Sequence, residues 1–259
     1  MKSLVEQQRE HFNDISAQYW EARKHPNHLL LKDLIWSNFF SGKQNLSRNQ
    51  IRVLEPMCGM SEGLQILKRH LKTNIDYSGF DYSEEMVEIA RKLHPTERIE
   101  WRDATTYSNQ GEPFDWIILI GGLHHVFSKS SEVVERLSSA LKPGGHFLSF
   151  EPTQNCFITR IMRQGIYKRN QIFDEQSEQG FDLSSLDNIF ERAGFEKEDQ
   201  IFPGLLAYIL YYNPDAFPYL NIGGERCVRT VFFFDRLLWR TWLAKKLSFA
   251  TITLWRKRK

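Results

Sequence analysis

The sequence predicts an α/β fold, a three-layer sandwich in which a seven-stranded, mostly parallel sheet lies between helices. First, short apolar runs alternate with amphipathic stretches from Ile51 to Phe150, which is typical of strand-helix-strand units. Second, polar or glycine-rich residues follow each apolar run, where a loop should begin. Third, 259 residues that are 41% hydrophobic and 25% charged suit one globular domain with additions.

Seven apolar segments are expected to form the strands. They are Ile51–Glu55, Ile75–Phe80, Ile99–Arg102, Trp116–Ile120, His146–Glu151, Phe195–Ile201 and Phe249–Trp255. The carboxyl ends of the first five should share one edge of the sheet, because parallel strands point the same way. Ligands of open α/β sheets bind at that edge.

Apolar residues at helical spacing predict the helices of the core. These are Ser83–Leu93 with Ser83 as N-cap, Glu132–Leu141 ended by Lys142-Pro143-Gly144-Gly145, and Leu183–Glu191. We expect one domain, 1–259, with a helical lid at 1–45, a core at 46–201, an aromatic helical insertion at 202–247, and a last strand with a basic tail at 248–259. Within the lid, Pro26 should break the helical stretch Glu6–Phe40.

Composition narrows the class of protein. A net charge of +2 gives no basis for nucleic-acid binding. The N-terminus lacks the apolar core of a secretion signal, and no apolar run is long enough to cross a bilayer, so we expect a cytoplasmic protein. Cys58, Cys156 and Cys227 fit neither a disulfide framework nor a zinc site, so we expect free thiols and no metal.

The segment from Glu55 to Gly63 carries the first chemical signal. Small residues and a turn after a strand let backbone amides approach a ligand at the start of a helix. The segment resembles motif I of the class I, Rossmann-like, S-adenosylmethionine-dependent methyltransferases. Only the middle glycine of that motif, Gly59, is in place, and Met57 and Ser61 stand at the flanking glycine positions.

Carboxylates follow the next two strands. Asp81 can accept hydrogen bonds from both ribose hydroxyls of a nucleoside, or it can be a solvated helix cap. Asp103 stands where the resemblance implies a contact with the adenine amino group, or it is an ordinary loop carboxylate. The resemblance thus implies S-adenosyl-L-methionine as cofactor. Its expected contacts are Tyr19, Arg23, Glu55, Met57, Cys58, Gly59, Asp81, Tyr82, Met86, Asp103, Ala104, Ile120 and Gly121.

Later segments extend the resemblance to about residues 10 to 201 and the final strand. The run from Asp115 to Val126 is similar to the family's fourth strand and its Leu-His-His continuation. The segment Leu141–Leu148 looks like the corner before the fifth strand. The resemblance also implies that the last strand is antiparallel. A dehydrogenase is disfavoured, since no GxGxxG opens the first helix.

Two adjacent histidines, His124 and His125, are the candidate catalytic bases, because imidazole titrates near neutral pH. Fixing the loop is the alternative for either one. Glu151 is a candidate for substrate binding or for orienting a histidine, and capping of the next segment is also open. Tyr19 and Arg23 resemble residues that close over the cofactor and meet its carboxylate.

The insertion at 202–247 is expected to select the acceptor, with Tyr208 and Tyr212 as candidate substrate contacts. Basic residues gather from it onward: Arg226, Arg229, Arg236, Arg240, Lys245, Lys246, Arg256, Lys257, Arg258 and Lys259. Aromatic and basic residues together suit peripheral contact with the inner membrane face or a lipid-linked substrate. The alternative is a helical cap with buried aromatics and solvated basic residues. A homodimer also stays open.

These features favour an O-methyltransferase that acts on a small molecule, a sugar or a lipid-linked acceptor. N-methylation and transfer-RNA modification are the enzymatic alternatives, although no RNA-binding module is recognisable. A cofactor-binding pseudoenzyme that serves as a partner protein is the alternative from another class. Titration with the cofactor identifies binders, and product turnover then separates enzyme from scaffold.

Overall fold

The sheet of this protein has seven strands in the order β3-β2-β1-β4-β5-β7-β6. We describe it from a computed structural model, for residues 21, 23–43, 46, 49–155, 180–214 and 219–259. The strands are β1 Gln50–Pro56, β2 Asn74–Asp81, β3 Arg98–Trp101, β4 Phe114–Ile120, β5 Leu141–Pro152, β6 Phe195–Ile201 and β7 Ala250–Lys257. β7 pairs antiparallel with both β5 and β6, whereas the other pairs are parallel. The predicted fold class is confirmed.

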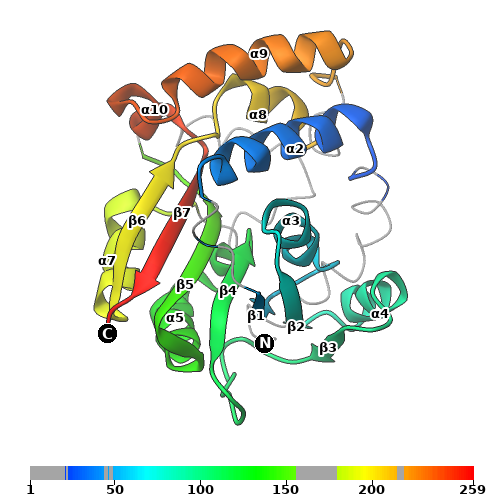
Figure 1. Ribbon diagram of the computed structural model, residues 1–259. Helices are drawn as coiled ribbons and strands as arrows, with labels where there is room; N and C mark the ends of the chain where they lie inside the picture. The colour runs from blue at the N-terminus through cyan, green and yellow to red at the C-terminus, as the bar shows by residue number, and fades with distance from the viewer. Residues whose placement is uncertain (1–20, 22, 44–45, 47–48, 156–179, 215–218) are drawn as a thin grey trace, which may run out of the picture.

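Helices lie on both faces of the sheet (Figure 1). They are α2 Pro26–Phe40, α3 Glu62–His70, α4 Glu84–Leu93, the 3-10 helix η2 Leu123–Lys129, α5 Ser130–Ala140, α7 Leu183–Arg192, α8 Leu206–Tyr211, α9 Glu225–Leu238 and α10 Trp242–Leu247. α8, α9 and α10 come from the insertion, and α8 and α9 lie beside α2 (Figure 1). In the described ranges, no helix combines the length and apolarity that crossing a bilayer requires.

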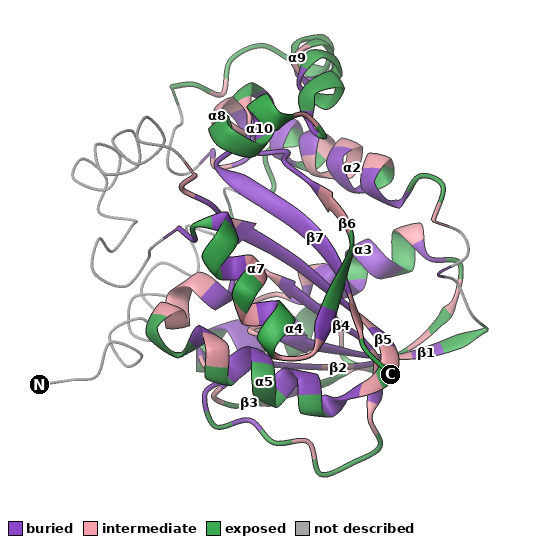
Figure 2. Ribbon diagram, turned by 90° about the vertical axis from the view of Figure 1, so that its left-hand side faces the viewer, coloured by how far each residue is buried: buried purple, intermediate pink, exposed green. Residues whose placement is uncertain are grey.

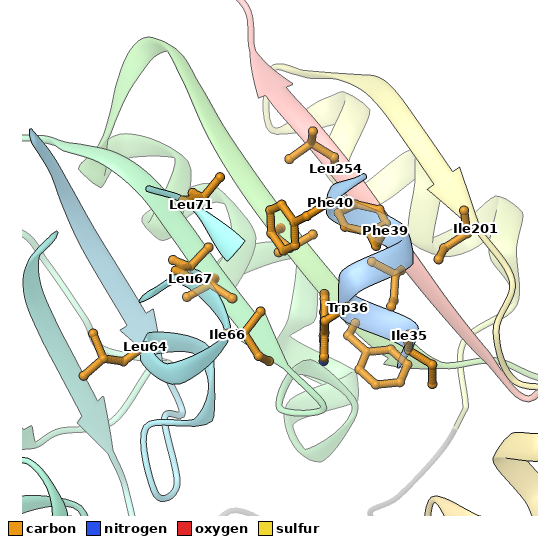
Figure 3. Close-up of a cluster of buried hydrophobic side chains, with 14 of the residues drawn as sticks. Ile35, Trp36, Phe39, Phe40, Leu64, Ile66, Leu67, Leu71, Ile201 and Leu254 are labelled. Atoms are coloured by element: carbon orange, nitrogen blue, oxygen red, sulfur yellow. The ribbon is translucent and has the colours of Figure 1, made fainter. Parts of the chain in front are cut away.

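Two apolar clusters hold the layers together. On one face, Trp36 and Phe39 of α2 pack with Leu67 of α3 and Leu254 of β7 (Figure 3). On the other face, residues of α5 and α7 pack on β4, β5 and β7, and Phe190 stacks on Trp255 with ring centroids 4.6 Å apart. Burying each such side chain stabilises the fold by about 1.5–3 kcal/mol, so α2 is part of the core.

Individual residues explain where several helices and strands begin. Ser83 is the N-cap of α4, as predicted, and its side chain accepts a hydrogen bond from the amide of Met86. Pro26 is the first residue of α2, because its missing N–H is tolerated in the first turn. β5 begins at Leu141 rather than at His146. The expected corner lies within it, as a register shift against β4.

Candidate active site

The loop between β1 and α3 has left-handed backbone at alternate residues. φ is 51° at Met57, 49° at Gly59 and 61° at Ser61. Met57 and Ser61 are the residues that replace motif glycines, so the loop keeps a glycine-type path with ordinary side chains. Each such residue costs roughly 1–2 kcal/mol relative to a right-handed conformation. Something nearby must therefore hold the loop.

Glu55 fixes the end of this loop from behind. Its Oε1 accepts the amide of Gly63 at 2.7 Å, and its Oε2 accepts the amide of Leu64 at 3.0 Å and the hydroxyl of Tyr77 at 2.7 Å. Burial raises the pKa of this carboxyl to about 8, although the three hydrogen bonds oppose that shift. Direct contact between Glu55 and the cofactor stays a prediction, because the side chain faces the start of α3.

Sequence reasoning missed the partners of Glu55. A Cβ at Gly63 would lie 2.8 Å from the Glu55 carboxyl, so only glycine lets α3 approach this closely. One signal could have found this contact. A glutamate that ends a buried strand needs hydrogen-bond donors, and the first amides of the next helix supply them.

Asp81 joins the second strand to the same loop. Its Oδ2 accepts the amide of Gly59 at 2.8 Å, and its Oδ1 accepts the amide of Ser83 at 2.9 Å. Burial raises the pKa of Asp81, and these amides lower it. The amide of Tyr82 also donates to this carboxyl, and a carboxylate has about four acceptor positions, so acceptor capacity remains for a ribose hydroxyl. No atom lies within 4 Å of a Cβ built on Gly59, which leaves space beside the loop.

The remaining cofactor candidates line the neighbouring strand ends. Both carboxyl oxygens of Asp103 accept hydrogen bonds from Thr105, through its amide at 2.7 Å and its hydroxyl at 2.8 Å. Met86 and Ala104 are buried, and the carbonyl of Tyr82 accepts the indole N–H of Trp101 at 2.8 Å. Cys58 is a buried free cysteine next to Gly59. Their contacts with the cofactor stay predictions.

The loop after β4 lies against the loop after β1. Ile120 ends β4, and Gly121 follows with φ 61°, its amide bound to the carbonyl of Phe150 at 2.7 Å. A Cβ at Gly122 would lie 2.8 Å from the Cβ of Met57. The cofactor candidates and the histidines are therefore neighbours in space.

His124 is held by the buried Glu151. The Nδ1 atom of His124 lies 3.0 Å from Oε2 of Glu151, and the amides of Leu123 and His124 donate to the same carboxyl at 2.9 and 3.3 Å. The Glu151 side chain is 0% exposed, and burial raises its pKa to about 8. Of the three roles expected for Glu151, which were substrate binding, orientation of a histidine and capping of the next segment, this geometry supports orientation of a histidine.

The two candidate bases differ in their surroundings. The ring of His125 packs against that of His124, with centroids 3.9 Å apart and planes tilted by 40°. The Cε1 atom of His124 lies 3.9 Å from a Cβ built on Gly121, which puts this ring beside the β4 loop. The carboxylate partner and this position make His124 the better-placed of the two candidates.

Lid and insertion meet over the end of β5. The guanidinium of Arg23 and the Nδ1 of His28 both reach the carbonyl of Tyr212, each at 2.7 Å. Tyr208 stacks on Tyr212 at 4.6 Å, and Tyr212 packs edge-on against Phe150 at 5.5 Å. Arg23, Tyr208 and Tyr212 thus come together. Tyr19 lies outside the described residues, as does Cys156.

Fold and site together bring Asp81, Asp103 and the loop around Gly59 to one sheet edge, next to a histidine that is held by Glu151. The sequence model of a protein family, described as Methyltransferase domain, matches residues 10–200 of this chain. Since this match covers most of the chain, the protein belongs to that family, and it is a class I S-adenosylmethionine-dependent methyltransferase. The residues around Gly59 and Asp81 fit the nucleoside part of that cofactor.

Solved structures share the fold. One is magnesium protoporphyrin IX methyltransferase (ChlM) from Synechocystis PCC 6803 with bound SAH, at 12% identity and TM-score 0.59, covering 96% of this chain and 97% of that chain. Another is the cyclopropane synthase MmaA2 from Mycobacterium tuberculosis, at 15% identity and TM-score 0.59, covering 85% and 82%. The YcgJ protein from Bacillus subtilis has 15% identity and TM-score 0.58, covering 87% and 99%. No curated protein matches the sequence significantly.

Proposed function

We propose that this protein methylates a hydroxyl oxygen of a small molecule, a sugar or a lipid-linked acceptor, with His124 as the base. The observation that carries the proposal is the bond between His124 and the buried Glu151, beside the loop at Gly121. A neutral amine can accept a methyl group without a base, whereas a hydroxyl must lose a proton. An oriented histidine therefore favours an oxygen acceptor.

The cofactor would be held by residues at three strand ends. Asp81 would bind the ribose, Asp103 the adenine amino group, and the loop from Met57 to Ser61 the remainder, with Arg23 near the carboxylate. S-adenosylmethionine supplies a methyl group that its sulfonium already activates. Positioning an acceptor in line with that methyl group can contribute roughly 7–11 kcal/mol.

The tautomer of His124 determines which nitrogen can accept the proton of the acceptor hydroxyl. With Glu151 ionised, Nδ1–H donates to its Oε2 and the lone pair of Nε2 is open to accept the proton of the acceptor hydroxyl. The carboxylate then stabilises the resulting imidazolium. A positioned base of this kind contributes about 10²–10⁴-fold to the rate. Tyr208, which is partly buried and stacks on the buried Tyr212, offers an aromatic ring on which an apolar acceptor or a sugar ring can pack.

The test is transfer of a labelled methyl group into a panel of hydroxyl-bearing and amine-bearing acceptors, with the methylated atom assigned in the product. We expect an O-methyl product. His124→Gln should lower kcat by about 10²–10⁴-fold at saturating cofactor, with unchanged cofactor affinity in calorimetry. His125→Gln is the matched variant and should lower kcat less.

Two results would contradict the proposal. One is a purely N-methylated product. The other is a kcat of His124→Gln equal to that of the parent protein, which would leave positioning as the whole of catalysis. A protein that binds cofactor but turns over no acceptor in a whole-cell extract would favour the scaffold alternative.

A further inference from the structure

The outer face of α9 and α10 exposes large apolar side chains. In α9 the buried side chains are Val228, Phe232 and Asp235, at helical spacing. The opposite side of α9 exposes Phe233, Phe234, Leu237 and Leu238, of which Phe234 is 61% exposed. The outer surface of the helix is exposed in Figure 2. These aromatics are not buried against the sheet, so the buried-cap interpretation is wrong for them.

Exposed apolar side chains also occur outside α9. In α10, Trp242 is 68% exposed and Leu243 is 45% exposed. In the segment before α9, Tyr219 and Ile222 are exposed as well. Single exposed apolar residues are normal on a protein surface, but neighbouring ones on two successive helices mark an interaction site. We call the apolar side chains of α9 and α10 the outer apolar face.

Basic side chains are exposed on the same helices and between them. They are Arg226, Arg229, Arg236, Arg240, Lys245 and Lys246. Arg229 is paired with the exposed Glu225 of α9, and Arg240 is paired with Asp199 of β6. From Arg226 to Lys259 the sequence has one acidic residue, Asp235, and this carboxyl is buried and accepts the amide of Ala207 at 2.6 Å. The ammonium of Lys246 lies over the ring of Trp242, 4.2 Å from its centroid. Apolar side chains beside a net basic charge match an anionic partner that also has an apolar interior.

We propose that the outer apolar face docks on an anionic lipid bilayer. Phe234, Leu237 and Trp242 enter the boundary between headgroups and acyl chains, while arginine and lysine side chains contact lipid phosphates. Tryptophan and lysine are both suited to that boundary, since each joins an apolar body to a polar end. This inference concerns location and does not depend on which acceptor is methylated.

Charge disfavours two other occupants. A second copy of the chain would meet this face through the same surface, and a two-fold interface would bring arginines against arginines. A nucleic acid would match the basic side chains but would leave Leu237, Leu238 and Leu243 without apolar partners. An anionic bilayer offers lipid phosphates to the basic side chains and acyl chains to the apolar side chains.

The experiment is flotation of the full chain with vesicles of phosphatidylcholine alone or of phosphatidylcholine mixed with phosphatidylglycerol, at low salt. We expect binding to the mixed vesicles, loss of binding with added salt, and little binding to the neutral vesicles. Phe234→Ser and Leu237→Ser should each weaken binding by up to about tenfold. Arg226→Gln and Arg236→Gln should each weaken it by about fivefold.

Matched controls come from α4, which lies elsewhere on the molecule. Leu93→Ser removes an exposed leucine, and Lys92→Gln removes an exposed lysine; both should bind like the parent. All variants change exposed side chains, and an unchanged melting temperature shows that they fold. Absence of binding to the mixed vesicles overturns the proposal. Vesicle binding that is unchanged in Phe234→Ser and Leu237→Ser also overturns it. A third contradicting result is a parent protein that does not bind vesicles but forms a dimer, if these two substitutions dissociate that dimer.

Discussion

Two buried glutamates, Glu55 at the end of β1 and Glu151 near the end of β5, make nearly the same local contacts. Each accepts two backbone amides from the start of a helix, α3 for Glu55 and η2 for Glu151. Burial raises the pKa of each to about 8. They differ in the third partner, which is the hydroxyl of Tyr77 for Glu55 and the imidazole of His124 for Glu151.

The third partner decides what each glutamate can do. Burial raises the pKa of Tyr77 well above its ordinary value of 10, and the neighbouring Glu55 raises it further, so the hydroxyl keeps its proton. Glu55 therefore stabilises structure. An imidazole gains and loses protons near neutral pH, so the equally buried Glu151 can take part in chemistry. The same hydrogen-bonding arrangement thus holds the candidate cofactor loop at one strand end and the proposed base, His124, at another.

The largest contrast should come from paired substitutions, Glu151→Gln and Glu55→Gln. Each glutamine keeps one acceptor oxygen, so one helix amide loses its partner and the free energy of unfolding falls by about 1–3 kcal/mol. Only Glu151→Gln should also lower kcat, by about 10²-fold, because His124 loses the carboxylate that orients and stabilises it. Chemical unfolding and steady-state kinetics measure the two effects.

The comparison would fail if both variants lost kcat equally at temperatures where both are folded. Glu55 would then act on the reaction and not only on the fold. Tyr77→Phe provides a control. It removes a hydrogen bond to Glu55, should cost about 1 kcal/mol of stability, and should leave kcat unchanged.

Asp81→Ala tests whether the loop after β1, which both Glu55 and Asp81 hold, binds the cofactor. It removes charge-assisted hydrogen bonds worth about 1.5–3 kcal/mol, so the cofactor Kd should rise by roughly 10–150-fold. Calorimetry with the cofactor measures this. Asp76→Ala, which changes a half-exposed aspartate of the same strand, is the control and should bind normally. An unchanged Kd for Asp81→Ala would remove the ribose assignment.

Raising the pH should lower stability through both glutamates but should change the rate only through Glu151. Both pKa values are raised from 4.5 to about 8, so the stability that each neutral carboxyl contributes is full below pH 4.5 and is lost as pH rises through about 8. Over the same range Glu151 ionises and frees Nε2 of His124, so kcat should rise by up to about tenfold per pH unit. Glu55→Gln should weaken the loss of stability without moving the kinetic midpoint. A rate that falls from pH 6 to 8 would contradict this assignment.

Much of the comparison could be predicted from sequence, because strand ends follow from the period of apolar residues. The alternation of apolar runs and amphipathic stretches, with the rule that parallel strands end at one edge, predicts that Asp81 and His124 lie at the same sheet edge. The Tyr77 contact with Glu55 could not be predicted, since it depends on the register that sets Val53 opposite Tyr77. The exposure of Phe233 and Phe234 could not be predicted either, because composition does not say which face of α9 is covered.

The smallest effect concerns backbone strain, which also separates the two regions. The β4 loop uses a glycine, Gly121, for its left-handed residue, whereas the β1 loop uses Met57. Met57→Gly should relieve this strain and raise the free energy of unfolding by about 0.5–1 kcal/mol, after the greater freedom of glycine in the unfolded chain is deducted. Gly122→Ala brings a Cβ to 2.8 Å from that of Met57, so alone it should destabilise by about 1–3 kcal/mol. In the Met57→Gly background, Gly122→Ala should lower the free energy of unfolding only slightly, because the side chain that it would contact is gone. If the effects of the two substitutions are additive in this double-mutant cycle, the two loops do not touch as described.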